Sequence, residues 1–457
     1  MACDFFLSFT WTNCALSFVV VAGALFFKWS RKYFLRMIDR RLGRIPPGPR
    51  AFPILGTIDI DTKQPQVTFR KWVAEYGDVF SFFLGSRFCI GVGDLALVRT
   101  LFRDNRFLGR PNQGIFGHLD GDVTEGILFG NGEIWKEHRR FALSALRDFG
   151  FGKASSLEKI QKEAAYLVEV LKEQDGAPYD PTMLFASVGS RNVISDLLFS
   201  GGFAPTDQRF IQFIENVKEN LRELAGPRDY IDAFFLTQHE RKTAGESLGT
   251  FTDKQLVRNV SDLFVAGYET TSTFLRWCMV YMIRNPEVQV KVQAEIDTVI
   301  GRARNPAPAD KSSLPYTDAV TIEIHRITSF VPFGISHCTT EEVKFEQYTI
   351  PKGTEIWPVQ CNHFMNPKIW GDPETFRPER FIGKSGELLH SLADEVQPFS
   401  VGRRACLGES LARNEIFTFF STILQNFTLT SEVVPSAEAR ISPVLTPPTF
   451  RLIARCR

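Results

Sequence analysis

The sequence predicts a mainly helical protein, with one helix-rich domain, small β-sheets and a membrane-spanning helix before it. Long stretches place apolar residues three and four positions apart with charges between them, which is the period of an amphipathic helix. Alternating, strand-like stretches are few and short. Near the N-terminus, the uncharged run from Phe5 to Phe27 is long enough to cross a bilayer as a helix.

Composition excludes several classes of protein. The 457 residues are 44% hydrophobic and 23% charged, values typical of a folded protein rather than a disordered one. A formal net charge of +1 argues against a nucleic-acid-binding protein that depends on bulk positive charge. The eight cysteines form no Cys-x-x-Cys pair, which argues against a zinc site or a disulfide scaffold and favours the reducing cytosol.

The N-terminal run is interpreted as an uncleaved anchor over residues 1–27. A cleaved signal peptide is the alternative, but its positive charges would precede the apolar core. Here Asp4 precedes the run, and the Lys and Arg residues from Lys28 to Arg44 follow it. The positive-inside rule then places the rest of the chain in the cytosol. Residues 28–50 are predicted to be a basic flank and a stiff proline-rich hinge, and residues 51–457 a catalytic domain.

Periodicity predicts the elements of this domain. The clearest helical patterns are Leu157–Lys172, Val257–Ile283, Pro286–Ile300 and Glu409–Gln425. The strands Val79–Leu84 and Phe88–Val92, separated by Gly85-Ser86-Arg87, are expected to form a hairpin, and Glu355–Val359 and Phe450–Ala454 two further strands.

The segment from Phe399 to Glu409 is the most specific chemical signal. It places Cys406 in a glycine-containing turn just before the helix pattern that begins near Ser410. Helix N–H groups and the helix dipole are expected to stabilise a thiolate there. Gly402 and Gly408 leave room for a large flat group to approach. Taken alone, Cys406 is better explained as a buried structural cysteine, and the combination of Phe, two Gly, Arg and Cys at this spacing is far more specific.

Together these residues resemble the signature of the cytochrome P450 superfamily, Phe-x-x-Gly-x-Arg-x-Cys-x-Gly. The matching positions are Phe399, Gly402, Arg404, Cys406 and Gly408. The resemblance implies the P450 fold, a haem b cofactor, and Cys406 as its thiolate ligand. The Pro-Pro-Gly-Pro hinge, Phe274-Leu275-Arg276-Trp277 and Ile350-Pro351-Lys352-Gly353-Thr354 most resemble family 2 of the animal microsomal members.

Further motifs of the superfamily follow in order. Glu323 and Arg326 are spaced to pair on one helix face, although such a pair alone is typical of a protein surface. Arg380, in Pro378-Glu379-Arg380-Phe381, resembles the second arginine of the family's structural Glu–Arg–Arg lock.

The run Ala266-Gly267-Tyr268-Glu269-Thr270-Thr271 lies within a helical pattern, where glycine and β-branched residues are unfavourable. It resembles the family's oxygen-binding kink. Thr270 would then position O₂ and a water molecule, and Glu269 would help to deliver protons. A hydrogen bond from Thr270 back to its own helix is the alternative explanation.

Trp135 and Arg139 are four residues apart on one predicted helix face. By resemblance this pair meets a haem propionate, with which an arginine forms charge-assisted hydrogen bonds. Arg110 and His337 lie where microsomal members carry further propionate contacts. Trp135 is also explained by ordinary core packing.

The resemblance implies a microsomal monooxygenase that hydroxylates or epoxidises a lipophilic small molecule with O₂ and NADPH-derived electrons. Its partners would be an NADPH-dependent flavoprotein reductase, a small cytochrome b and membrane lipid, with no nucleic acid. The protein would be located in the endoplasmic reticulum membrane, with its catalytic domain facing the cytosol. Lys136, Arg140 and Arg413 are candidates for a reductase-docking face or simply solvated charges. The candidate pocket residues are apolar: Phe116, Phe264, Ala266, Val331 and Phe333.

One departure from the family pattern lies near Ala225-Gly226-Pro227. Relatives have a further long helix and an apolar loop before the phrase that begins at Arg228, and both are missing from this sequence. That segment normally covers the substrate pocket. An alternative function is therefore a catalytically impaired haem-binding form, from a splice variant or a pseudoenzyme.

Overall fold

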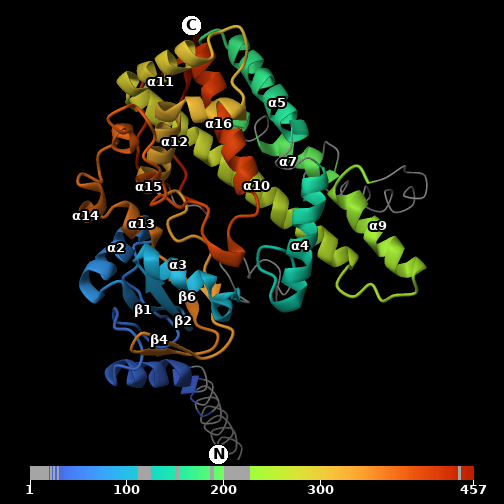
Figure 1. Ribbon diagram of the computed structural model, residues 1–457. Helices are drawn as coiled ribbons and strands as arrows, with labels where there is room; N and C mark the ends of the chain where they lie inside the picture. The colour runs from blue at the N-terminus through green and yellow to red at the C-terminus, as the bar shows by residue number, and fades with distance from the viewer. Residues whose placement is uncertain are drawn as a thin grey trace, which may run out of the picture. The chain divides into compact units, whose positions relative to one another are not determined.

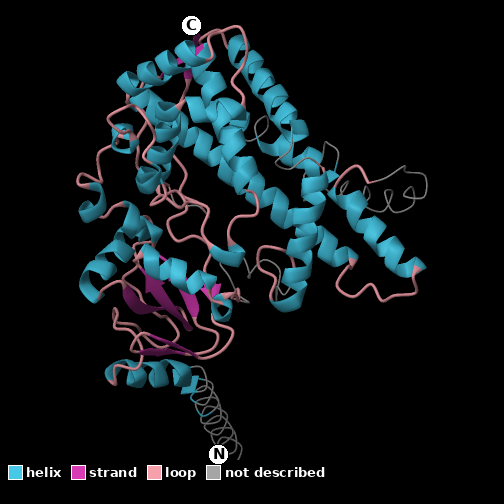
Figure 2. Cartoon of the chain, viewed as in Figure 1, coloured by secondary structure: helices cyan, strands magenta, loops and turns pink. Residues whose placement is uncertain are grey.

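A computed structural model describes residues 20, 23, 26–27, 30–111, 125–149, 154–185, 190–199, 227–440 and 444–457. The chain divides into two compact units (Figures 1 and 2). Unit 1 comprises residues 1–111 and 333–363, and unit 2 comprises residues 112–332 and 364–457. Most of the predicted anchor, from Phe5 to Phe27, lies outside the described residues. Among those that are described, no helix combines the length and the apolar character that crossing a bilayer requires.

Unit 1 contains the strands of the main sheet. The order is β1 (Val79–Leu84), β2 (Arg87–Val92), β6 (Glu355–Pro358) and β3 (His337–Cys338). The predicted hairpin is confirmed, because β1 pairs antiparallel with β2 from Val79↔Val92 to Leu84↔Arg87. Strand β6 pairs parallel with β2 and antiparallel with β3. The remaining elements are a helix at 30–41, α2 (Pro65–Tyr76), α3 (Leu95–Arg103), η1 (Asn105–Phe107), β4 (Val343–Phe345) and β5 (Tyr348–Ile350), with α13 (Gln360–Phe364) at the boundary.

Unit 2 is predominantly helical. Its elements are α4 (Gly132–Asp148), α5 (Ala154–Glu173), α6 (Pro181–Leu184), α7 (Ser190–Phe199), α9 (Tyr230–Thr243), α10 (Asp253–Arg284), α11 (Pro286–Val299), η4 (Pro308–Ser313), α12 (Pro315–Thr328), α14 (Pro367–Trp370), η5 (Pro378–Phe381), α15 (His390–Ala393), η6 (Gly402–Arg404), α16 (Glu409–Asn426), β7 (Phe427–Thr430) and β8 (Ile453–Cys456). The four predicted helices are therefore confirmed to within a few residues.

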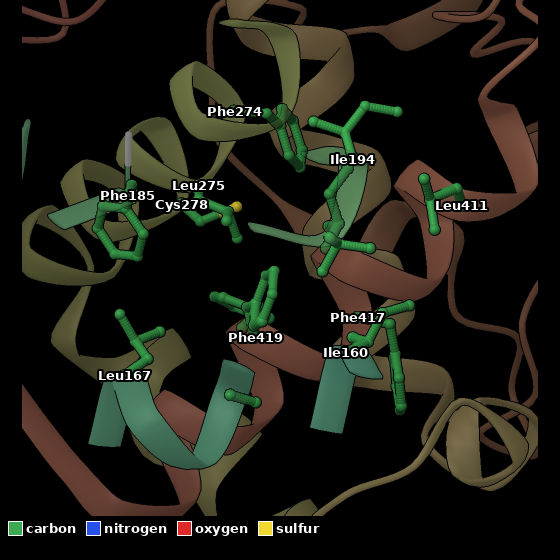
Figure 3. Packing of buried hydrophobic residues seen from close by; sticks show 14 of the residues in the cluster. Ile160, Leu167, Phe185, Ile194, Phe274, Leu275, Cys278, Leu411, Phe417 and Phe419 are labelled. Atoms are coloured by element: carbon green, nitrogen blue, oxygen red, sulfur yellow. The ribbon is translucent and has the colours of Figure 1, made fainter. Parts of the chain in front are cut away.

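The core of unit 2 forms around α10, which packs against α7 and α16 (Figure 3). Phe274, Leu275 and Cys278 of α10 lie in one cluster with Ile194 of α7 and Phe419 of α16. The Thr252 side chain caps α10 by accepting a hydrogen bond from Gln255 N–H, which satisfies an otherwise unpaired donor.

Helix packing explains the glycine at position 267, which is unfavourable within a helix. A Cβ atom at this position would lie 3.2 Å from the Ile194 side chain, so the glycine allows α7 to approach α10 closely. The helix nevertheless continues without a break across the Gly–Thr–Thr stretch. Gly267 therefore serves helix packing in addition to any chemistry.

A buried hydrogen-bond network joins α4, α9 and α10 through His138. Gln255 Nε2 donates to Asn259 Oδ1, which fixes the orientation of the Asn259 amide. Asn259 Nδ2 then donates to Tyr230 Oη at 3.0 Å and to His138 Nδ1 at 3.2 Å. His138 Nε2 lies 3.0 Å from Thr250 Oγ1 and 3.2 Å from the Thr250 carbonyl. The network therefore assigns a neutral imidazole that accepts at Nδ1 and donates from Nε2.

The surroundings of His138 favour this neutral form. Phe234 and Phe251 pack against its ring at centroid distances of 5.8 and 4.8 Å, and burial lowers its pKa from the usual 6.5. Thr250 also donates to Glu137, whose carboxylate accepts from Arg241 at 2.8 Å. A proton on Nδ1 would face the amide donors of Asn259 and lose that hydrogen bond.

We predict that stability falls as the pH drops below about 6.5, because the unfolded chain binds the proton that folded His138 excludes. The stabilisation from neutral His138 is fully present above the pKa that this histidine has in the unfolded chain. As the pH falls below that value, the free energy of unfolding decreases by up to about 1.4 kcal/mol per pH unit for one proton. His138→Gln replaces both hydrogen bonds without a titrating group. The slope of the free energy of unfolding against pH should therefore be shallower in this variant, as measured by urea unfolding. An unchanged slope would contradict the assignment.

Candidate functional site

The loop before α16 presents Cys406 through backbone geometry. Ser400 has φ +62° and Gly402 has φ +77°, so two residues in the left-handed region turn the chain sharply. Cys406 N–H donates to the Phe399 carbonyl at 2.9 Å, and Ala405 N–H donates to the Gly402 carbonyl at 3.1 Å. These bonds close the loop. Its cysteine comes directly before α16, whose N-cap, Gly408, has no side-chain cap.

The Cys406 side chain is exposed, and the structural alternative of a buried cysteine is wrong. A Cβ atom built at Gly408 would meet only Cys406 Sγ, at 3.9 Å, so space is open beside the sulfur. Desolvation by the surrounding protein raises the pKa of this thiol above 9.0, and the Gly408 backbone hydrogen bond offsets it only in part. The shift describes the free thiol, and the thiolate that the sequence predicts at Cys406 stays a prediction.

Helix α4 is fastened to this loop by the predicted pair and by Arg404. Arg139 donates to the Ala405 carbonyl at 2.6 Å. Arg404 Cζ lies 3.7 Å from the centroid of the Trp135 ring, a cation–π distance, and Arg404 also donates to the Gly130 carbonyl at 2.7 Å. The structure thus brings Trp135, Arg139, Arg404 and Cys406 together.

Trp135 supplies an unused hydrogen-bond donor at this site. The side chain is buried, and its Nε1 has no hydrogen-bond partner among the described residues. Buried donors are normally paired, so an oxygen atom of a bound group fits here. The exposed sulfur, the open space beside Gly408 and this donor together fit a flat prosthetic group that carries carboxylates.

Arg110 and His337 form a separate cluster within unit 1. Arg110 donates to the carbonyls of Ile335 and Ser336, both at 2.8 Å. His337 Nδ1 lies 2.8 Å from the Phe107 carbonyl, and its ring stacks on Phe102 at a centroid distance of 3.5 Å. The contacts hold both side chains in place beside the same strand. Their role toward a propionate stays a prediction.

Thr270 and Glu269 lie mid-way along α10. Thr270 Oγ1 donates to the Ala266 carbonyl at 2.7 Å, so the back-bonded geometry that the sequence left open is the one present. Such a bond is compatible with a locally bent helix and leaves the hydroxyl oxygen free to accept. The catalytic roles of these two residues stay predictions.

The Glu–Arg–Arg lock is assembled and buried. Glu323 and Arg326 form a bidentate pair at 2.7 and 2.8 Å, and both side chains are fully buried. Arg380 Nε reaches the same carboxylate at 3.1 Å. The alternative of a surface ion pair is therefore wrong. The predicted spacing of three residues on one helix is confirmed.

The remaining predicted residues are dispersed. Phe116 lies outside the described residues. Phe264 stacks on Tyr268, whereas Phe333 packs in unit 1 against Phe69 at a centroid distance of 4.6 Å. Val331 is half-buried against the core of unit 2.

The candidate docking residues are divided between two surfaces. Lys136 and Arg140 lie in one surface hollow of about 750 Å³, whereas Arg413 is paired with Glu409 at 2.9 Å and lines a different hollow. Sequence reasoning missed Arg147 and Arg403, which line the first hollow. The spacing of Arg140 and Arg147 by seven residues on one helix was the available signal.

A buried carboxyl beside α10 was also missed. Glu415 of α16 is buried and hydrogen-bonded to Thr271, and burial raises its pKa well above the usual value. An acidic residue directly before the mostly apolar stretch Ile416–Phe420 was the signal that could have indicated it. Glu415 therefore places a buried carboxyl next to the predicted kink.

The family model and the similar proteins all identify the cytochrome P450 family. The model of the cytochrome P450 family matches residues 46–227 and 207–454. Similar proteins include cytochrome P450 2C55 of Mus musculus, 35% identical over 467 residues, and cytochrome P450 2C16 of Oryctolagus cuniculus, 37% identical over 469 residues. Each alignment covers 90% of this chain and 94% of the relative. Cytochrome P450 2B4 of Oryctolagus cuniculus is 36% identical over 445 residues, covering 86% and 89%.

We predict that Glu323→Ala costs about 3–5 kcal/mol of stability, because it leaves two buried guanidinium groups without their shared carboxylate. Glu133→Ala is the matched control. Its pair with Lys136 is largely exposed and should contribute at most about 1 kcal/mol. Midpoints of urea unfolding measure both changes. Equal losses in the two variants would show that the buried trio is not a structural lock.

Proposed function

Because the chain belongs to the cytochrome P450 family and is a P450 monooxygenase, we propose that Cys406 is the thiolate ligand of its haem b. The observation that carries this proposal is the exposed sulfur on a loop that Arg139 fastens to α4. Family members bind haem b through a cysteine thiolate. In this chain, Gly408 leaves open space beside the Cys406 sulfur.

The residues around Cys406 support the assignment in different ways. Trp135 Nε1 is the available donor for a propionate, and Arg404 places a fixed positive charge against the Trp135 ring. Arg139 acts mainly on the loop, since it binds the Ala405 carbonyl. We therefore interpret Trp135 and Arg404 as the propionate contacts of unit 2, and Arg139 as the residue that positions the loop.

When bound, the haem supplies activation of O₂ by thiolate-ligated iron. The chain's own contribution on α10 is to hold protons and water. Thr270 can accept a hydrogen bond while donating to Ala266, and Glu269 is the neighbouring acid. We propose that this pair carries protons to the reaction.

The proposed reaction is hydroxylation or epoxidation of a lipophilic small molecule with NADPH-derived electrons. A flavoprotein reductase, with a small cytochrome b as a further donor, would bind the hollow lined by Lys136, Arg140, Arg147 and Arg403. Five basic side chains line this hollow against two acidic ones, Glu133 and Glu137, and this excess of positive charge supports a partner with an acidic face. The basic flank after an uncharged run supports attachment to the endoplasmic reticulum membrane, with the body in the cytosol.

The test of the ligand assignment is the carbon monoxide difference spectrum of the reduced protein. Cys406→Ala should abolish the band of thiolate-ligated haem. Cys361→Ala is the matched control, since Cys361 is buried and lies in unit 1. If Cys406→Ala keeps the band, Cys406 is not the ligand.

We propose a catalytically impaired haem-binding form as a second candidate function, and a difference in length from a relative is the observation that supports it. The family model matches in two pieces that overlap at residues 207–227. The alignment with cytochrome P450 2C55 is 467 positions long, although this chain has only 457 residues. Only 90% of this chain takes part in the alignment. That relative therefore has residues without a counterpart here. Pro227 and Arg228 lie at the edge of the overlap.

We predict that the present chain couples NADPH oxidation poorly to product, because an uncovered pocket admits water and weakens the fixed electrostatics of the site. The measurement compares product formed per NADPH consumed, with purified reductase, for the chain and for a variant with a helix-forming insert between Leu224 and Arg228. We expect the insert to raise coupling several-fold. Tight coupling without the insert would instead support a competent monooxygenase.

A further inference from the structure

We propose that His325 is a positioning residue for the cysteine loop. Through the ring of Phe399 it holds the backbone hydrogen bond of Cys406, and in this way it keeps water and further hydrogen-bond donors away from the sulfur. The inference rests on the proposed function, in which Cys406 is the haem ligand. It adds to that site a residue of α12 that acts on the sulfur through another side chain.

The backbone of α12 supports His325 rigidly. Its neighbour Arg326 forms the buried bidentate pair with Glu323 and donates to the carbonyls of Phe364 and Pro373, both at 2.8 Å. These bonds join α12 to segments that are remote in sequence. A side chain beside such a network is held in place by its own backbone, as a positioning residue must be.

Two rings connect His325 to the site. Phe274 of α10 stacks on the imidazole at a centroid distance of 3.7 Å and an interplanar angle of 12°. Phe399, at the start of the loop, meets it at 5.8 Å and 66°. This edge-to-face arrangement is a preferred one for aromatic pairs, and the close stack leaves no space for the imidazole to move toward α10. The position of His325 therefore limits where the ring of Phe399 can lie.

Phe399 transmits this contact to Cys406. Its ring also lies 4.7 Å from Arg413 Cζ, and Arg413 is held by Glu409 at 2.9 Å. The Phe399 carbonyl accepts the hydrogen bond from Cys406 N–H at 2.9 Å. Because the ring and the carbonyl belong to one residue, contacts that fix the ring also limit the movement of the carbonyl. His325 and Arg413 together therefore stabilise the bond that closes the loop.

Stability alone does not explain an imidazole at this position. His325 is only 7% exposed, and its Nδ1 has no hydrogen-bond partner among the residues that the structure describes. An unpaired buried nitrogen is unfavourable, and a leucine would avoid that cost. Burial also lowers the pKa of His325 well below its usual value, so the ring is neutral and brings no charge to the loop. What it contributes is a flat shape at a fixed place.

The two rings also stand between water and the loop. His325 and Phe399 line a surface hollow of about 460 Å³, together with Arg413. When Phe399 is free to move, water from this hollow can enter the loop and donate a hydrogen bond to the sulfur. Such a bond withdraws electron density from a thiolate ligand and so raises the reduction potential of the iron. The proposal therefore predicts a change in the potential as well as in the loop.

Hydrogen exchange of the full-length holoprotein tests the positioning of the loop. His325→Leu removes the ring, whereas His325→Phe keeps a flat ring in its place. We expect deuterium uptake at Cys406 N–H to be several-fold faster in the leucine variant and unchanged in the phenylalanine variant, as read by mass spectrometry of peptides that contain residues 400–406. His325→Met, which also lacks the ring, replaces the leucine variant if that one does not fold. Equal exchange in the parent and the variant without the ring would overturn the proposal.

Phe330→Leu is the matched control. Phe330 is also buried and packs against Phe274 at 5.5 Å and against His325 at 5.8 Å, but among the described residues no ring contact joins it to Phe399. Its replacement should lower stability without changing exchange at Cys406. Equal changes in Phe330→Leu and His325→Leu would show a general loosening of the core, and would overturn a specific role for His325.

The reduction potential is a readout that a merely structural residue would not move. In a potentiometric titration followed by absorbance, we expect His325→Leu to shift the potential in the positive direction, with a several-fold larger equilibrium constant for reduction. His325→Phe and Phe330→Leu should keep the value of the parent. Phe399→Leu should match His325→Leu, and the double variant should add little, because both changes break one contact. An unchanged or more negative potential in His325→Leu would overturn the proposal.

Exchange at Cys406 N–H does not depend on the iron ligand, so failure of this inference and failure of the proposed function are distinguishable. If the parent chain lacks the thiolate band but His325→Leu still exchanges faster, the haem assignment fails and the positioning of the loop stands. If the band is present and His325→Leu matches the parent in exchange and in potential, the positioning fails and the haem assignment stands.

Discussion

A sulfur atom that must stay accessible can be held only through its neighbours, and this constraint organises unit 2. Cys406 contributes its backbone N–H, which donates to the Phe399 carbonyl, while Arg139 from α4 binds the carbonyl of the preceding residue. The Arg404 side chain then lies on Trp135 of the same helix. Helix α4 is therefore needed for the shape of the loop before any ligand is present. A change at Arg139 would act on the cysteine through the backbone.

Helix α12 connects the loop to the rest of the unit. Arg326 and Arg380 share the single carboxylate of Glu323, so the buried trio carries excess positive charge. Backbone carbonyls compensate for it. Arg326 donates to the carbonyls of Phe364 and Pro373, and Arg380 donates to that of Trp370. Because desolvation makes buried charges expensive, the gain of this arrangement is a fixed backbone between α13 and η5.

His325, next to Arg326, extends the connection by packing alone. Its ring stacks on Phe274 of α10 at 3.7 Å and meets Phe399 at 5.8 Å, and burial lowers its pKa well below the usual value. One neutral imidazole thus touches both the helix of Thr270 and the start of the cysteine loop. Helix α12 thereby joins the lock, α10 and the loop.

Local patterns predicted the features that depend on local sequence. The bounds of α5, α10, α11 and α16, the β1–β2 hairpin and the exposed Cys406 turn follow from periodicity, glycine positions and spacing. The last strand was expected at Phe450–Ala454 and lies at Ile453–Cys456. Its register is set by pairing with β7, where Thr430 faces Ile453, and this partner is remote in sequence.

Burial and partner choice were not predictable in the same way. A Glu-x-x-Arg pair has the same spacing on a surface as in a core, and the burial of Glu323 follows from packing of α12 against η5. Arg139 was expected to face a ligand, but its partner is a carbonyl 266 residues away.

Local interactions specify the start of α9, directly after Pro227. Asp229 caps α9 by accepting from Asp232 N–H, and Arg228 pairs with the buried Asp232 carboxylate at 2.8 Å. Tyr230 then joins the Asn259–His138 network. The start and the position of α9 are therefore specified by residues 228–232 and their partners, whatever precedes them. Through Tyr230 and Asn259, these residues also connect α9 to His138 of α4, the helix whose Arg139 binds the cysteine loop.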